Sequence, residues 1–151
     1  MAPLTSAQQR IKQETTKALI KINKSKRIMQ HPEDSLHKQI ANYLYQLESA
    51  GKFGRAGFFT YMPFGEKRDL KTGALLKAKG TKKGVPDFMI IYRIDLSSEI
   101  FWIECKSDKG KQTKEQKEFE TKAKTSLNEN YIIIKSCEEL VAYFEEVGIL
   151  N

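Results

Sequence analysis

Two short stretches of this chain place acids and a lysine in a pattern that suits phosphodiester chemistry. Pro86-Asp87 precedes one predicted strand, and Glu104-Cys105-Lys106 ends the next. Two carboxylates a few ångströms apart repel each other unless a cation lies between them. Oxygen ligands without His or Cys favour Mg²⁺ or Mn²⁺, which bind one or two carboxylates together with phosphate and water. We therefore expect Asp87 and Glu104 to hold a divalent ion and Lys106 to act on a bound phosphate.

This expectation depends on how the two strands pair. If Ile94 pairs with Glu99, Asp87 lies opposite Lys106, and Glu104 lies on the same face, diagonal to Asp87. Diagonal neighbours are roughly 7–8 Å apart, which is within side-chain reach of one shared ion. A slip of one residue would send one strand's side chains to the other face, so the predicted site depends on this register.

The same three residues have a simpler interpretation as an exposed cross-strand ion pair on one face of a sheet. Against it, Glu104 and Lys106 directly follow the apolar run 100–103, where a charged cluster is costly unless it is used. An acid-x-Lys sequence alone is a weak signal, and its combination with Pro86-Asp87 before the neighbouring strand is stronger.

Glu33 is a further candidate, because it precedes Leu36 by three and Ile40 by seven positions and so shares their apolar helix face. A carboxylate directed at a core needs a partner, and a metal site, directly or through water, would provide one. The alternative is an exposed glutamate near the helix start, where the helix dipole favours a negative charge.

Gln116 likewise precedes Phe119 by three and Ala123 by seven positions, which turns it inward. However, Thr113-Lys114-Glu115-Gln116 also has the spacing of a capping box, in which Gln116 only caps the helix. The sequence leaves both roles open.

The elements that must position these residues follow from hydrophobic periodicity and turn signals. We expect a basic helix at about 6–29, a helix from His31-Pro32 to Gly51, a strand at 57–63, a long basic loop at 64–85, strands at 88–94 and 99–105 around a turn at 95–98, a helix at about 113–127, a strand at 131–135 and a helix at about 137–147. This order predicts an α/β protein with a mixed sheet covered by helices on both faces.

The net charge of +7 is unevenly distributed. Residues 1–31 contain seven basic residues and one acidic residue, and residues 66–83 contain seven and two. Clustered positive charge is typical of a protein that binds a polyanion, although a solvated charged face is equally compatible. The predicted nucleic-acid contacts are Lys12, Lys17, Lys21, Lys67, Arg68, Lys77, Lys79, Lys82 and Lys83.

The composition, 40% hydrophobic and 30% charged in 151 residues, is that of a globular domain. We expect one domain at 32–151, preceded by a basic arm at 1–31. No apolar run approaches the ~20 residues of a membrane span, and the N-terminus has no apolar signal segment. Cys105 and Cys137 have no close Cys or His companion in the sequence, which favours two reduced cysteines in a cytoplasmic protein.

These motifs together resemble the VRR-NUC family of the PD-(D/E)xK nuclease superfamily over about residues 32–135. The resemblance rests on the basic lead-in Lys77-Ala78-Lys79-Gly80, on Gly84-Val85-Pro86-Asp87-Phe88, on Trp102-Ile103-Glu104-Cys105-Lys106-Ser107, on Lys109-Gly110 with Thr113 and Gln116, and on Glu33 in the first helix. Cys105 departs from the family, where Val or Leu is more usual.

The resemblance implies a restriction-endonuclease-like core of order αβββαβ and a Mg²⁺- or Mn²⁺-dependent nuclease. It assigns Asp87, Glu104 and the Cys105 backbone carbonyl to the metal, Lys106 to catalysis, and Glu33 and Gln116 to supporting roles. For a standalone chain of this size, the resemblance further implies a phage or bacterial protein that acts as a homodimer on branched DNA, such as Holliday junctions or flaps.

The leading hypothesis is therefore a structure-selective DNA endonuclease in which the basic segments follow the phosphate backbone. The alternative is a non-catalytic nucleic-acid-binding protein on a degenerate nuclease scaffold. A restriction-type enzyme is a third option, although the chain has no obvious specificity domain.

Overall fold

The structure, a computed structural model, describes residues 32–64 and 70–150. The chain divides into two units, Met1–His31 and Pro32–Asn151, and the description below concerns the second. The helix expected at about 6–29 lies outside the described residues. So do five of the predicted nucleic-acid contacts, Lys12, Lys17, Lys21, Lys67 and Arg68.

Four strands form one mixed sheet in the order β1-β2-β3-β4. Their bounds are Phe58–Tyr61 for β1, Phe88–Ile94 for β2, Ser97–Cys105 for β3 and Asn130–Ile134 for β4. The first three strands pair antiparallel, and β3 and β4 pair in parallel. The two longest strands, β2 and β3, occupy the centre of the sheet, as predicted.

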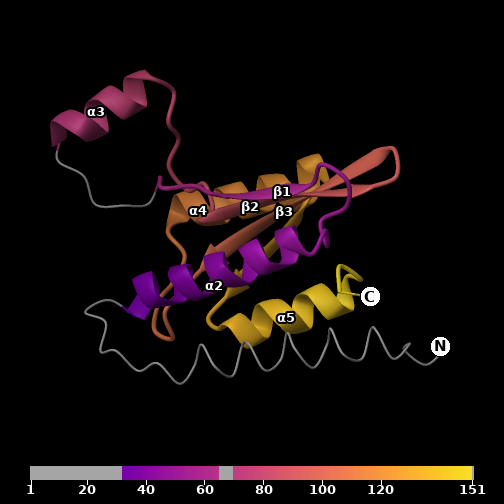
Figure 1. The fold of residues 1–151 in the computed structure, drawn as a ribbon. Helices are drawn as coiled ribbons and strands as arrows, with labels where there is room; N and C mark the ends of the chain where they lie inside the picture. The colour runs from indigo at the N-terminus through magenta and orange to yellow at the C-terminus, as the bar shows by residue number, and fades with distance from the viewer. Residues whose placement is uncertain (1–31, 65–69, 151) are drawn as a thin grey trace, which may run out of the picture. The chain divides into compact units, whose positions relative to one another are not determined.

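Helices cover both faces of this sheet (Figure 1). Helices α2 (Pro32–Ser49) and α5 (Cys137–Glu146) lie on one face. Helix α4 (Lys114–Thr121) continues as the π-helix η1 (Lys122–Leu127) on the other face and provides the crossover that the parallel strand β4 requires. The predicted mixed α/β architecture is confirmed.

Adjacent residues of β3 show the two layers directly. The ring of Phe101 contacts Tyr143 of α5, and the ring of Trp102 contacts Phe119 of α4. Because successive side chains of a strand point to opposite faces, Glu104 belongs to the α4 layer together with Trp102. The strand therefore delivers a carboxylate under the first turn of α4.

The apolar stripe predicted for α2 is buried as expected. Leu36, Ile40, Leu44 and Leu47 are each 7% exposed or less, and Tyr43 is fully buried beside them. The helix ends before Gly51, whose φ of +69° is a left-handed conformation that glycine adopts without a steric penalty. The buried side chains of α2, α5, β2 and β3 make up most of the core.

The expectation of an uninterrupted loop at 64–85 is wrong. Helix α3 (Leu70–Ala78) lies within it, so the observed element order gains a helix between β1 and β2. Its leucines, lysines and alanines are strong helix formers, but none of its side chains is buried. Without a buried apolar face, the segment lacks the periodic pattern that would have predicted it.

The predicted register of β2 and β3 is also wrong, by two residues. Ile94 pairs with Ser97 rather than with Glu99, around a two-residue turn formed by Asp95 and Leu96. Asp95 has a φ of +52°, a left-handed conformation that aspartate tolerates better than most residues. The Ser97 hydroxyl also donates a hydrogen bond to the Ile94 carbonyl at 2.9 Å. This tight turn pairs two residues that the prediction had assigned to the loop.

The correction changes which charged residues are neighbours. The ladder ends with Phe88 paired to Ile103, so the next position brings Asp87 beside Glu104 instead of opposite Lys106. Because side chains alternate with a period of two, a shift of two residues leaves every side chain on its predicted face.

None of the described helices is both long enough and apolar enough to cross a membrane.

Candidate active site

Asp87, Glu104 and Lys106 meet where β2 begins and β3 ends. The Lys106 ammonium lies 2.5 Å from Oε1 of Glu104. Oδ2 of Asp87 accepts a hydrogen bond from the backbone N–H of Cys105 at 2.8 Å, which fixes this carboxylate to the end of β3. One end of the sheet thus carries an ion pair and a second carboxylate whose charge acts on Glu104.

Glu104 is the buried charged residue of the described core, with an exposed fraction of 1%. Both of its side-chain partners, the Lys106 ammonium and the Gln116 amide, contact the same oxygen, Oε1. Its other oxygen, Oε2, is buried and has no hydrogen-bond partner among the described residues. A buried carboxylate oxygen without a partner is costly, so this atom is suited to face a cation.

The electrostatics of Glu104 agree with this geometry. Burial, followed by the negative charge of Asp87, raises the pKa of Glu104 to about 7, although Lys106 lowers it. A single lysine is therefore not enough positive charge for the two acids. A divalent cation beside Oε2 would supply the missing charge.

Gln116 performs both of the roles that the sequence left open. Its Oε1 accepts a hydrogen bond from the Thr113 N–H at 2.8 Å, and its own N–H donates to the Thr113 hydroxyl at 3.2 Å, which completes the capping box of α4. Its Nε2 donates to Glu104. The cap fixes the amide in the orientation that presents its N–H to the carboxylate.

Glu33 lies at the edge of the site in the first turn of α2. Its side chain is 46% exposed, and its Oε1 is 4.0 Å from the Lys106 ammonium. Glu33 therefore approaches the site through Lys106, while half of its side chain remains in solvent. Glu33 is therefore both an exposed glutamate in the first turn of the helix and a neighbour of the site, the two interpretations that the sequence allowed.

Gly84 explains how the Pro86-Asp87 segment reaches its place. A Cβ at Gly84 would lie 2.4 Å from the backbone carbonyl of Glu115, and the residue has a φ of +81°. The chain before Asp87 therefore packs directly on the first turn of α4, which only glycine permits. The helix that carries Gln116 and the segment that carries Asp87 are fixed to each other by this contact.

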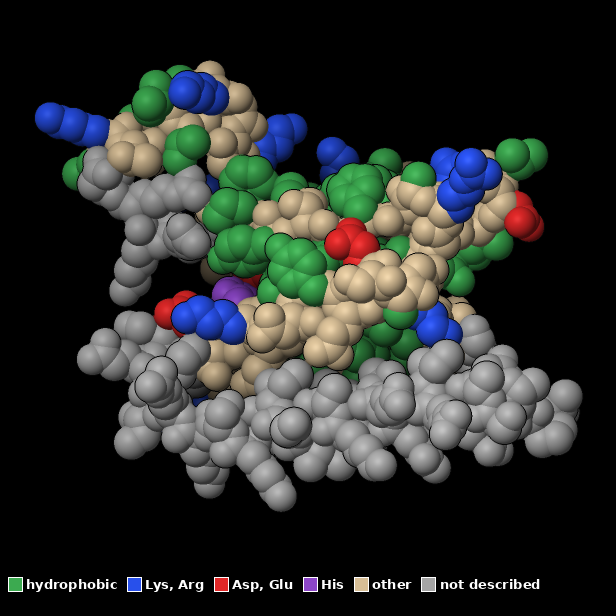
Figure 2. Space-filling view, viewed as in Figure 1, with side chains coloured by type: hydrophobic (Ala, Val, Ile, Leu, Met, Phe, Trp, Pro, Cys, Tyr) green, Lys and Arg blue, Asp and Glu red, His purple; other side chains and the backbone are tan. Residues whose placement is uncertain are grey.

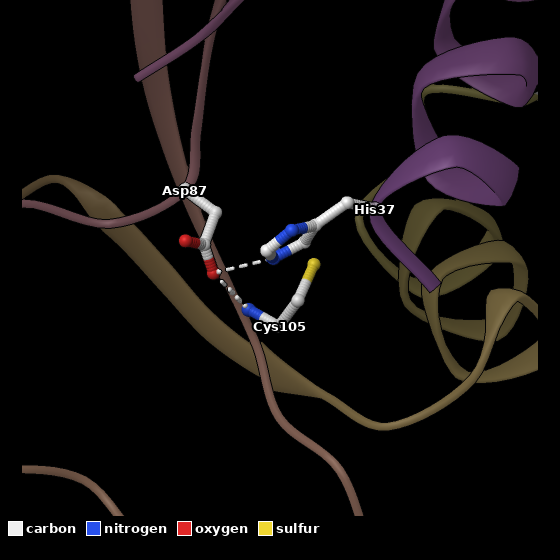
Figure 3. Close-up of side chains that lie close together, drawn as sticks. All are labelled: His37, Asp87 and Cys105. Carbon is white, nitrogen blue, oxygen red and sulfur yellow. Dashed lines mark hydrogen bonds and ion pairs between the residues drawn. The ribbon is translucent and has the colours of Figure 1, made fainter. Parts of the chain in front are cut away.

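His37 is a site residue that the sequence prediction missed. Its Nε2 lies 3.3 Å from Oδ2 of Asp87, while the other Asp87 oxygen points away from the imidazole (Figure 3). Burial lowers the pKa of His37, but the nearby Asp87 carboxylate, with the charges of Glu33 and Asp34, outweighs it and raises the pKa. A signal existed, since His37 follows Glu33 by four positions on the same helix face.

Cys105 also has a neighbour that its sequence position did not reveal. The ligand atoms of His37, Asp87 and Cys105 all lie within 4.8 Å of one another. No histidine lies close to Cys105 in the sequence, but the fold brings His37 to it from α2. Burial raises the pKa of the Cys105 thiol, and both cysteines are free, as predicted.

Four of the predicted nucleic-acid contacts lie in described residues, and all four are exposed: Lys77, Lys79, Lys82 and Lys83. Basic side chains project from the α3 segment into solvent (Figure 2). These lysines can reach a polyanion without the cost of leaving a buried environment.

No family model, curated protein or solved structure matches this chain. The functional argument therefore rests on the residues themselves and on their geometry.

Proposed function

We propose that this protein is a Mg²⁺- or Mn²⁺-dependent DNA endonuclease with a restriction-endonuclease-like core of the VRR-NUC type. One observation carries the proposal: Glu104 is buried beside Lys106 and Asp87, and one of its carboxylate oxygens has no hydrogen-bond partner among the described residues. A protein rarely retains an uncompensated buried charge unless it is used.

The donor set fits a hard divalent cation. Oε2 of Glu104 and the outward-pointing oxygen of Asp87 are carboxylate ligands, and the Cys105 backbone carbonyl is the third ligand that the family resemblance implies. When bound, such an ion supplies positive charge to the phosphodiester and makes water easier to deprotonate.

Lys106 acts on the phosphate in this proposal. Its side chain is 12% exposed and its ammonium contacts Glu104, so the residue is held in place and still reaches the surface. There it donates hydrogen bonds to a non-bridging phosphate oxygen and stabilises the charge that develops as water attacks phosphorus. Gln116 keeps Glu104 in position, and Glu33 keeps negative charge near the ammonium.

The substrate in this proposal is DNA bound through its backbone. The exposed lysines of the 77–83 segment, together with the basic residues at 10–27 and 66–68, would contact phosphates without reading base sequence. Paired cuts in a branched substrate such as a four-way junction would require two copies of the site, which a two-fold homodimer provides.

The test is cleavage of a labelled panel consisting of a four-way junction, a flap, single-stranded DNA and duplex DNA. Each substrate is incubated with Mg²⁺, Mn²⁺ or EDTA and with wild-type protein, Glu104→Gln or Glu120→Gln. Glu120 is a matched control because it also binds one lysine and one glutamine, but its side chain is 24% exposed rather than buried.

We expect metal-dependent cutting by the wild type and by Glu120→Gln, and none by Glu104→Gln. Cutting by Glu104→Gln at the wild-type rate would overturn the proposal. DNA binding without cutting in every metal would instead support a non-catalytic nucleic-acid-binding protein.

A further inference from the structure

A second arrangement of possible ligands lies beside the proposed Mg²⁺ site and differs from it in chemistry. It consists of a ring nitrogen of His37, a carboxylate oxygen of Asp87 and Sγ of Cys105, with all three atoms within 4.8 Å of one another. The closest approach of His37 to Asp87 is between Nε2 and Oδ2. Figure 3 shows the imidazole and the thiol on the same side of the Asp87 carboxylate, opposite its outward-pointing oxygen. Nitrogen, oxygen and sulfur together are the ligand types of Zn²⁺ and related thiophilic ions, whereas Mg²⁺ prefers oxygen.

The contact between His37 and Asp87 has the dimensions of two ligands on one ion. A tetrahedral Zn²⁺ with bonds of about 2.0–2.1 Å places its nitrogen and oxygen ligands about 3.4 Å apart. The observed separation of Nε2 and Oδ2 is 3.3 Å, which is long for a hydrogen bond. Nε2 is buried and makes no hydrogen bond of good geometry to a described residue. Nε2 therefore faces Asp87, but its hydrogen-bonding capacity is not satisfied by the described residues.

The residues around His37, Asp87 and Cys105 orient these side chains and leave the cluster accessible to solvent. The His37 ring packs against Phe88 and Tyr61, which limits its rotation. The backbone N–H of Cys105 donates to Oδ2 at 2.8 Å and so keeps the Asp87 carboxylate next to Cys105. The side chains of His37 and Asp87 are 20% and 16% exposed, so solvent reaches the outer side of the cluster.

We propose that His37, Asp87 and Cys105 form a binding site for a thiophilic divalent cation such as Zn²⁺. Binding forms bonds from the ion to Nε2, Oδ2 and Sγ, and the Cys105 thiol releases its proton to solvent as the sulfur bond forms. Three protein ligands leave the fourth tetrahedral position to water. A tetrahedral site requires the sulfur about 3.6 Å from the other two atoms, which lies within the 4.8 Å span of the cluster.

This site shares Asp87 with the proposed Mg²⁺ site. A carboxylate that neutralises one cation through Oδ2 has less negative charge to offer a second cation through its other oxygen, and the two ions also repel each other. Zn²⁺ is therefore expected to inhibit Mg²⁺-dependent cleavage. This consequence rests on the proposed nuclease function, whereas binding of the thiophilic ion does not.

The direct test is titration of the full chain with Co²⁺, a spectroscopic substitute for Zn²⁺, in the absence of DNA and Mg²⁺. Coordination by a cysteine gives an intense near-ultraviolet thiolate-to-cobalt band that oxygen and nitrogen ligands do not give. The variants are Cys105→Ala, His37→Asn and the matched control Cys137→Ala. Cys137 is a second buried free cysteine that lies outside the cluster.

We expect the wild type and Cys137→Ala to develop the band at one equivalent of Co²⁺ and to lose it when Zn²⁺ is added. Cys105→Ala should lack the band, and His37→Asn should need at least about tenfold more Co²⁺. Absence of the band in the wild type overturns the proposal, as does its persistence in Cys105→Ala. Loss of the band in Cys137→Ala alone would assign the metal to a different site and overturn it equally.

The inhibition is measured separately, as the Zn²⁺ concentration that halves each variant's own cleavage rate in Mg²⁺. That concentration should be at least about tenfold higher for His37→Asn than for Cys137→Ala. If the protein proves not to be a nuclease, the cobalt titration still decides the metal site. If it cleaves DNA and the wild type shows no cobalt band, only the second site is refuted.

Discussion

Two carboxylates in this molecule have the same kinds of partner, one lysine and one glutamine, but their pKa values shift in opposite directions. The sets are Glu104 with Lys106 and Gln116, and Glu120 with Lys124 and Gln112. At Glu120 the lysine contacts Oε1 and the glutamine contacts Oε2, each at 2.8 Å. At Glu104 both partners contact Oε1, and the buried Oε2 has none among the described residues.

The pKa values follow this difference. Burial, then Asp87, raises the pKa of Glu104 to about 7. Burial also raises the pKa of Glu120, but hydrogen bonds from Lys124 and Gln112 outweigh it and leave the pKa lowered. The same two partners therefore stabilise the ionised form of Glu120 but do not fully compensate the charge of Glu104. The difference depends on how deeply the carboxylate is buried and on which of its oxygens the partners contact. The second arrangement costs stability and leaves an oxygen available for a ligand.

The largest expected effect is the difference in cleavage rate between a variant without Lys106 and a variant without Lys124. We expect Lys106→Met to lower the metal-dependent cleavage rate by about 10³-fold, because it removes the ammonium beside the reacting phosphate. Lys124→Met should cleave within about twofold of wild type, because that ammonium serves a surface pair. Single-turnover cleavage of the preferred substrate measures both rates.

Circular dichroism must first show that Lys106→Met is folded, since removal of one partner of a buried pair is destabilising. If folded Lys106→Met cleaved as fast as Lys124→Met, the proposed role of the buried pair would be wrong.

The next effect concerns stability without metal. Glu104→Gln should increase the free energy of unfolding by about 1–3 kcal/mol at pH 8 in EDTA, because it removes a carboxylate whose pKa is raised to about 7 in the folded state. Glu120→Gln should instead lower that free energy slightly, because the pKa of Glu120 is lowered. Urea unfolding at pH 5 and pH 8 measures both differences.

The pH dependence provides the sharper test. A carboxyl with a raised folded-state pKa stabilises the fold while it is protonated. The stability of the metal-free wild type should therefore fall as the pH rises from about 4.5 through about 7. The advantage of Glu104→Gln should grow over the same interval and nearly vanish at pH 5. An advantage independent of pH would mean that charge is not its cause.

Local patterns were sufficient to predict much of this molecule. The four stripe residues of α2, the two central strands and the capping box of α4 each depend on residues close in the sequence, and the structure contains all of them. Helix α3 was missed because an exposed helix carries no hydrophobic period. Glycine and lysine in that segment indicate a loop as readily as a solvated helix.

The details of the site required information that periodicity does not contain. The pairing of Asp87 with Glu104 depends on the left-handed Asp95, and the sequence does not show which residues of that turn leave the ladder. The neighbours of Cys105 depend on how α2 packs across the sheet, which brings in His37. The types of the charged residues were predictable, whereas their contacts depended on turn and packing geometry.

A smaller effect separates the two glutamines. Gln116→Ala should lower the affinity for Mg²⁺ by about tenfold, because it frees the carboxylate of Glu104, and Gln112→Ala should leave it unchanged. Thr113→Ala removes the cap but not the contact to Glu104, so it should cost about 1 kcal/mol of stability without the loss of affinity. Equal metal affinity in Gln116→Ala and Thr113→Ala would mean that Gln116 only caps the helix and does not support the metal site.

The smallest effect is expected at the surface of α4 itself. Lys114 and Glu118 lie 3.7 Å apart with side chains 88% and 65% exposed, so Glu118→Gln should change the free energy of unfolding by less than about 0.5 kcal/mol. Added salt should abolish that difference, because exposed charges are screened within a few ångströms at about 1 M. The difference produced by Glu104→Gln should persist at the same salt concentration, because its charge is buried. If both substitutions responded equally to salt in urea unfolding, burial would not be what distinguishes the two regions.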